Sequence, residues 1–268
     1  MKKKLSALLA IIMLVMLAGC SSAPKGDPSQ VISSYYEKVK NGDAEGAYDL
    51  LAEASKKSFT KDEFKIWQSL QTEVNPLKSY KVEKISEKKD AELEGVKYKN
   101  VVEFNITETD FSAYDNKEVN LNYKRNVVND NGVWKVYREK EDGKKAIADD
   151  YNSLAYLYIE GKGGKTKDLN KAATILNDGI KISQDYAQIY YTLASVYDDL
   201  GRYDEALNSI NTYISKETDN KGKSDGYNVL GSIYIGKHDL NDAKAAYSKA
   251  LELNPDNQYA KTNLSKLN

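Results

Sequence analysis

Apolar residues in the first part of the chain recur at the spacing of amphipathic helices. Asp27 supplies an N-cap, and Thr60 with Glu63 forms a capping box. The Asn41-Gly42 pair ends the first helical pattern. The spacing of the apolar positions therefore predicts three helices, over 28–40, 43–54 and 60–74.

After the third helix, the apolar period changes from about 3.6 residues to about 2. Val102, Phe104 and Ile106 alternate with polar residues, and an Asn131-Gly132 turn tolerates positive φ in a hairpin. The alternation predicts four strands, one beginning near Tyr80 and three over 96–107, 119–127 and 133–137. Helices followed by such strands indicate an α+β domain, with the helices on one face of an antiparallel sheet.

This order of elements, ending in a Gly-x-Trp-Lys-Val hairpin, resembles the cone-shaped fold shared by ketosteroid isomerase and nuclear transport factor. The resemblance covers residues 28–140 and implies a cavity that binds ligands in some relatives. An isomerase-type site needs an acid and a hydrogen-bond donor. Suitable residue types are present, although no spacing singles them out: Asp90, Glu94, Tyr98 and Tyr123. We therefore predict no catalytic residues and expect the tyrosines to cover the sheet face.

The second part of the chain, residues 148–268, repeats itself. The positions Tyr190, Leu193, Ala194, Tyr197 and Ala206 recur as Tyr227, Leu230, Gly231, Tyr234 and Ala243. An earlier copy starts at Tyr151 and has a longer glycine-rich turn. The copies resemble the tetratricopeptide repeat, a pair of antiparallel helices, and the first copy resembles its Sel1-like variant. This resemblance implies an all-α solenoid of three repeats, closed by a capping helix that includes Tyr259.

Tetratricopeptide domains bind peptides in the groove lined by the first helix of each repeat. Transferring that face to this chain gives ten candidate binding residues: Asn152, Tyr156, Gln188, Tyr191, Ser195, Asp198, Asp199, Asp225, Asn228 and Ser232. The family's clamp for C-terminal carboxylates uses lysine, arginine and asparagine, whereas this face carries acids. We expect a protein or peptide partner with a basic or neutral polar segment. The alternative is that the acids only solvate the surface.

The N-terminus has the pattern of a secretory signal, with three lysines followed by an uncharged stretch over 5–19. The Leu-Ala-Gly-Cys sequence ending at Cys20 resembles the lipobox of bacterial lipoproteins. The resemblance implies that residues 1–19 are removed, that the Cys20 thiol carries a diacylglycerol with fatty acyl chains such as palmitate, and that 20–27 is a tether. An ordinary signal peptide with a chance cysteine is the alternative.

Composition removes several classes of function. Lys and Arg total 39 against 40 acids, and removal of residues 1–19 takes three lysines and leaves a net charge of −4. No basic field exists to bind nucleic acid. One cysteine and one histidine argue against a disulfide framework, a Cys/His zinc site and a Cys–His catalytic pair. We therefore expect no metal and no cofactor.

The chain is thus predicted to be a lipoprotein anchored to the extracytoplasmic face of a cell membrane. With only three arginines among its 39 basic residues, it fits an AT-rich, Gram-positive host. We expect a non-enzymatic adaptor or assembly scaffold. Two alternatives stay open: a small-ligand-binding first domain that the repeats position, and a purely structural envelope protein.

Overall fold

The computed structural model describes residues 24–267, so the lipobox and Cys20 lie outside the described residues. Three α-helices come first, α1 (Pro28–Lys40), α2 (Ala44–Asp49) and α3 (Lys61–Val74), with a short 3-10 turn, η1 (Ser55–Lys57), before α3. Four strands follow, β1 (Leu77–Leu93), β2 (Val96–Ser112), β3 (Lys117–Asp130) and β4 (Val133–Tyr137). The predicted succession of helices and then antiparallel strands is confirmed.

The capping signals act where the sequence places them. The Asp27 carboxylate accepts a hydrogen bond from the backbone N–H of Ser29, and Pro28 begins α1. At α3, the Thr60 hydroxyl accepts from the backbone N–H of Glu63, and the Glu63 carboxylate accepts from the backbone N–H of Thr60. These bonds satisfy donors that a helix start leaves without partners.

The second helix is shorter than its apolar pattern predicts. It ends at Asp49 and not near residue 54, because the next residues pair with the last strand. The backbone N–H of Val136 donates to the carbonyl of Leu50, and the N–H of Ala52 donates to the carbonyl of Val136, each at 2.9 Å. This short parallel bridge joins segments that lie far apart in sequence.

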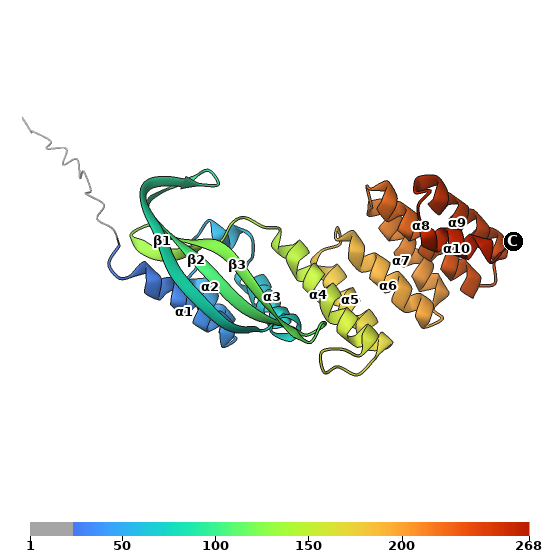
Figure 1. Cartoon of the computed structure of the whole chain (residues 1–268), viewed down its shortest axis with the longest axis horizontal. Coiled ribbons are helices and arrows are strands. Elements are labelled where there is room, and N and C mark those ends of the chain that lie inside the picture. The colour runs from blue at the N-terminus through green and yellow to red at the C-terminus, as the bar shows by residue number, and fades with distance from the viewer. Residues whose placement is uncertain (1–23, 268) are drawn as a thin grey trace, which may run out of the picture.

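The strands form one antiparallel sheet in the order β1-β2-β3-β4, and Figure 1 shows α1–α3 against one of its faces. The core between them contains the fully buried side chains of Ile32, Phe64, Phe104, Ile106 and Val136. Successive strand residues point to opposite faces, so alternate positions of β2, β3 and β4 look toward the helices. The cone-shaped assignment of this part stays a prediction.

Up to residue 267, where the description ends, seven further helices follow: α4 (Gly143–Glu160), α5 (Leu169–Ile182), α6 (Ala187–Asp199), α7 (Tyr203–Lys216), α8 (Asn220–Gly236), α9 (Leu240–Leu253) and α10 (Gln258–Ser265). They extend away from the sheet as successive pairs, with α10 at the far end (Figure 1). Within residues 24–267, no helix combines the length and the apolar character that crossing a bilayer requires.

Small residues lie where the paired helices approach, as the repeat pattern predicts. Ala194, Ala206 and Ala243 are fully buried. A Cβ at Gly231 would come within 2.5 Å of the Tyr247 ring on the partner helix. The tyrosines therefore fill the space that the small residues leave, which is the close packing expected of a protein interior.

Overpacking one of these positions tests the repeat packing. We expect Ala206→Leu to lower the free energy of unfolding by about 1–3 kcal/mol, because the added atoms have no space between α6 and α7. Asn208→Leu, at an exposed position of α7, is the matched control and should change it little. Urea unfolding followed by circular dichroism measures both. Equal stability of the two variants would contradict the packing described.

The helical array is packed directly onto the first part of the chain. Ile147 of α4 is fully buried in the core under the sheet, and Tyr151 and Leu154 contact the cores of both parts. The Gln71 amide of α3 donates to both carboxylate oxygens of the buried Asp150, at 2.8 and 2.7 Å. Helix α4 begins at Gly143, before residue 148, at which the repeats were predicted to start. Its first turns therefore belong to this junction.

Candidate functional sites

The ten candidate groove residues all lie on the first helix of a pair, with Asn152 and Tyr156 on α4, five on α6 and three on α8. Their centre is Tyr191, whose ring packs edge-on against Tyr213 of α7 with centroids 5.1 Å apart. The pKa of Tyr191 is raised by its burial and then by the nearby Asp225, Tyr156 and Tyr259. The structure therefore brings Tyr156, Tyr191 and Asp225 together.

Helix α10 closes one end of this face. The Asn257 amide donates to Asp225 at 3.0 Å and to the buried Ser224 hydroxyl at 2.9 Å. Farther along, the Asn263 amide donates to the Asn228 side-chain oxygen at 3.0 Å. Asp225 and Asn228 thus anchor the capping helix and keep only part of their polar surface for a ligand.

Four other candidates have different surroundings. Asn152 is buried, and its side-chain oxygen has no hydrogen-bond partner among the described residues. Ser232 lies 3.3 Å from the Tyr247 hydroxyl of α9, within the packing of its own helix pair. Ser195 donates back to the carbonyl of Tyr191 at 3.3 Å. Gln188 is exposed and lines a separate small hollow of about 300 Å³ beside Tyr186.

Acidic groups dominate the face. Burial raises the pKa of Asp198, and Asp199 beside it, which is exposed, raises it further. Burial also raises the pKa of Asp225, although Lys221 and the Asn257 hydrogen bond act in the opposite direction. These carboxyls are therefore poorly solvated, and a cationic group bound beside them would favour their ionised form.

Sequence reasoning missed two aromatic residues at this face. Tyr259 of α10 is 77% exposed, which is unusual for so large a side chain. The Tyr186 hydroxyl donates to the Asp149 carboxylate, which joins the start of α6 to α4. The repeat pattern places neither residue on the groove, because Tyr186 precedes α6 and Tyr259 belongs to the capping helix.

A second candidate site is a pocket of about 230 Å³ between α1, α3 and the inner face of the sheet. Side chains alternate between the two faces along each strand, and this alternation explains which polar residues face the pocket. Glu108 and Asp110 continue the inward-facing series of β2 that contains Ile106, while Tyr123 and Arg125 continue that of β3. Arg138, just after β4, lies two residues beyond the inward-facing Val136 and also lines the pocket.

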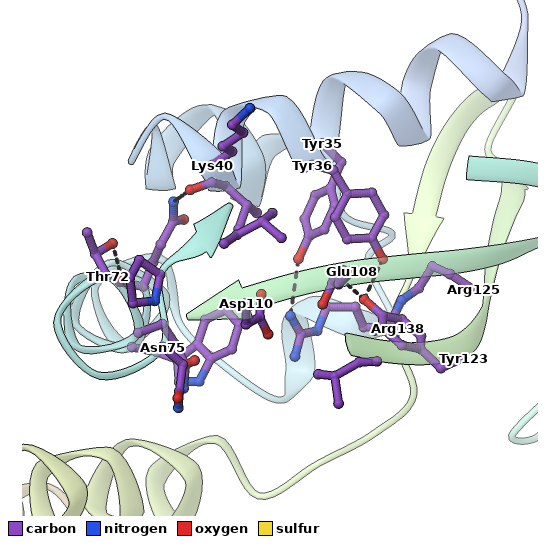
Figure 2. Close-up of a pocket in the computed structure, with 17 residues that line it drawn as sticks. Tyr35, Tyr36, Lys40, Thr72, Asn75, Glu108, Asp110, Tyr123, Arg125 and Arg138 are labelled. Atoms are coloured by element: carbon purple, nitrogen blue, oxygen red, sulfur yellow. Dashed lines mark hydrogen bonds between the residues drawn. The ribbon is translucent and has the colours of Figure 1, made fainter. Parts of the chain in front are cut away.

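Hydrogen bonds connect these side chains across the pocket. Figure 2 shows Tyr35 and Tyr36 reaching from α1 toward the strands. The hydroxyls of Tyr36 and Tyr123 lie 2.9 Å apart, and the Tyr123 hydroxyl donates to the Glu108 carboxylate. The Tyr35 hydroxyl accepts from Arg138 at 3.1 Å.

Burial shifts the ionisation of the pocket residues. It raises the pKa of Tyr36 to about 12. It also raises the pKa of Glu108, although the Tyr123 hydrogen bond and the charges of Arg125 and Arg138 act in the opposite direction. Burial, followed by the charge of Glu108, raises the pKa of Asp110 to about 6. The two carboxyls therefore share a poorly solvated environment, in which each disfavours the ionisation of the other.

Of the four candidate residues that the sequence offered in this domain, Asp90, Glu94, Tyr98 and Tyr123, only Tyr123 lines this pocket. Tyr98 packs in a separate cluster, 5.9 Å from the Tyr137 ring, and Glu94 accepts a hydrogen bond from the Tyr137 hydroxyl. The signal for the missed carboxylates was present, because Glu108 and Asp110 occupy the inward phase of an alternating strand. Across residues 24–267, no group of three His, Cys, Asp or Glu side chains is arranged to hold a metal ion.

Comparison with known proteins concerns the second part of the chain. The model of the tetratricopeptide repeat-like domain family matches residues 126–268, just over half of the chain. The heat shock protein STI1 of Saccharomyces cerevisiae is 34% identical over 102 residues, which are 38% of this chain and 17% of that protein. The chain thus spans about a sixth of the length of this curated relative.

Solved tetratricopeptide domains also superpose on the chain. The Arabidopsis OM64 domain is 20% identical and has a TM-score of 0.41, over 46% of this chain and 96% of that one. The second domain of human RPAP3, solved with the HSP70 peptide SGPTIEEVD, is 23% identical and has a TM-score of 0.39, over 45% of this chain and 93% of that one.

Proposed function

Because the chain belongs to the tetratricopeptide repeat-like domain family, we propose that it is a non-catalytic adaptor or assembly scaffold whose helical array binds a protein or peptide segment. The observation that carries this proposal is the face formed by α4, α6 and α8. It presents aromatic rings around Tyr191 and the half-buried carboxylates of Asp198 and Asp225. Such a combination suits an extended segment with cationic side chains, which interact with both acids and rings.

The charge of the face distinguishes this partner from an acidic peptide. The HSP70 peptide in the RPAP3 structure ends in Glu-Glu-Val-Asp. Asp198, Asp199 and Asp225 lie on the corresponding first helices here, and like charges across an interface are costly. The preferred partner is therefore a segment that carries lysine or arginine.

Charge reversal at the groove tests this function. We expect Asp198→Lys combined with Asp199→Lys to weaken binding of a lysine-rich peptide about tenfold or more, because attraction becomes repulsion. The salt dependence of binding should fall as well. Glu252→Lys combined with Asp256→Lys makes the same charge change at exposed residues away from these helices. Fluorescence anisotropy at two salt concentrations measures all three chains.

The outcome also separates binding from surface solvation. If the peptide binds both double variants as it binds the unchanged chain, the groove function is wrong and the acids act only as solvated surface. Crosslinking from intact cells, followed by mass spectrometry of the captured proteins, then identifies the natural partner. A captured segment without basic residues would contradict the proposed charge preference.

We place this adaptor at the extracytoplasmic face of a membrane. The support is the Leu-Ala-Gly-Cys sequence ending at Cys20, which lies after a basic and then an uncharged stretch. Two acyl chains on one residue give stable anchoring, whereas a single chain gives only marginal binding. In this arrangement the first part of the chain lies near the bilayer and the array extends beyond it.

A second function is favoured by one observation. The pocket under the sheet is a partly open hollow lined by aromatic, charged and polar residues. Concave sites with a few converging polar groups are typical of small-molecule binding. We therefore keep a ligand-binding role for the first part of the chain beside the adaptor role of the array.

A further inference from the structure

The pocket contains two carboxylates, of which only Glu108 lies near enough to the arginines of the pocket for their charge to lower its pKa. Glu108 and Asp110 lie two residues apart on the inner face of β2 and both line the cavity. Within residues 24–267, neither forms an ion pair, and the Asp110 side chain has no hydrogen-bond partner. A carboxylate accepts hydrogen bonds only, so each has unused acceptor capacity toward the cavity.

The two arginines of the pocket are engaged by other groups. Arg125 donates to Glu139 at 2.9 Å, and its guanidinium lies 5.0 Å from the centre of the Tyr123 ring. Arg138 donates to Glu141 at 2.7 Å and lies 4.6 Å from the centre of the Trp67 ring. Each guanidinium thus has a carboxylate outside the pocket as its counter-charge.

The side-chain nitrogens Nε of both arginines are buried without a hydrogen-bond partner among the described residues. They lie out of reach of solvent, so they do not offer donors to a ligand in the cavity. The charges of Arg125 and Arg138 still offset part of the charge of Glu108, so Asp110 is the carboxylate with the least compensated charge, and a cationic ligand can neutralise it together with the remaining charge of Glu108. Lys40 also lines the pocket but is exposed to solvent.

The remaining walls set the size and the polarity of an occupant. They include apolar and aromatic side chains, Val39, Trp67, Pro76, Leu77 and Leu121, and also the polar side chains of Gln68, Gln71, Thr72 and Asn75. A volume of about 230 Å³ corresponds to about eight water molecules at the packing of the liquid. This space accepts a small molecule with an apolar body and one polar end.

We propose that this pocket binds a small organic molecule carrying a protonated amine, whose ammonium group is held by the carboxylates of Glu108 and Asp110. An ammonium group supplies three donors and no acceptor, which matches two acceptor-only carboxylates. Its positive charge removes the repulsion between them. The inference rests on the ligand-binding role proposed above for the first part of the chain and is independent of the groove.

Three probes that share one ring and differ in charge test the class of ligand: benzylamine, benzyl alcohol and benzoate. Each is titrated into the full-length chain by isothermal titration calorimetry. We expect benzylamine to bind at least about tenfold more tightly than the other two. Tighter binding of benzoate or benzyl alcohol would overturn the amine class while leaving a ligand-binding pocket. Absence of binding by all three would overturn both the class and the pocket function.

Variants test the position of the site. We expect Asp110→Asn and Glu108→Gln each to weaken benzylamine binding about tenfold; glutamine keeps an acceptor for the Tyr123 hydroxyl. Glu118→Gln removes the same charge from an exposed position of β3 and should leave binding unchanged. The midpoint of thermal unfolding is measured for each variant to show that it folds. Benzylamine binding that all three variants leave intact would place the amine elsewhere and overturn the proposal.

Discussion

We expect the Cys20→Ala chain to be lost almost entirely from the membrane fraction and to be recovered in the aqueous phase. Each buried CH₂ of an acyl chain contributes about 0.8 kcal/mol to membrane binding. Removal of the thiol that accepts the lipid therefore removes the whole anchor. Detergent phase partitioning of cells that express each chain measures this effect.

The neighbouring serine provides the control for this experiment. Ser21→Ala retains the cysteine and its surroundings and should partition as the unchanged chain does. Mass spectrometry of the N-terminal peptide should show a diacylglycerol on Cys20 in the control only. If Cys20→Ala leaves partitioning unchanged, the lipobox interpretation is wrong, and the membrane location proposed for the adaptor is wrong with it.

The second large effect concerns Asp150 at the junction of the two parts. Burial raises the pKa of its carboxyl to about 7, opposed by the Gln71 hydrogen bond and supported by the charges of Asp149 and Glu141. The ordinary value is 3.8, so between about pH 4 and pH 7 the folded chain binds more protons at this site than the unfolded chain. Stability from this group is complete below that window and is lost as the pH rises through it.

Asp150→Asn removes this titration while keeping an oxygen that accepts from the Gln71 amide. A pKa unit corresponds to about 1.36 kcal/mol, so the variant should be more stable than the unchanged chain at pH 8 by about 2–4 kcal/mol. At pH 4 the two chains should differ little. Urea unfolding at both pH values gives the measurement.

The same substitution at an exposed aspartate is the control for the pH dependence of stability. Asp256→Asn, in the turn before α10, should keep the loss of stability between pH 4 and pH 8. If Asp150→Asn also keeps that loss, the buried carboxyl is not its source.

Local signals were sufficient for most elements. The capping box at Thr60 marks the first residue of α3, and the Asn-Gly turn at Asn131 marks the last hairpin. Hydrophobic period is a property of neighbouring residues, so it can be recognised without the rest of the fold. The predicted end of the second helix was wrong, because the residues after Asp49 pair with Val136, which lies in the last strand.

For the candidate sites too, the sequence pattern predicted some features, while others depend on contacts that only the folded chain makes. The repeat spacing placed all ten candidate residues on the first helices of the pairs, but it did not predict the contribution of Tyr259 or the Asn257 hydrogen bond to Asp225. In the first part of the chain, the alternation that predicts β2 also carries Glu108 and Asp110 inward. An inward acid becomes recognisable as a site only when the helices enclose it.

The sequence by itself determined the order of helices and strands, the repeat family of the second part and the lipobox resemblance at Cys20. Those features depend on spacing along the chain, which each segment carries without its neighbours. The tertiary structure alone decided which charges are compensated. Arg125 and Arg138 pair with Glu139 and Glu141, while the half-buried Glu108 and Asp110 and the buried Asp150 form no ion pair within residues 24–267. Burial and ion pairing depend on residues that folding brings together from distant positions, and no local pattern contains them.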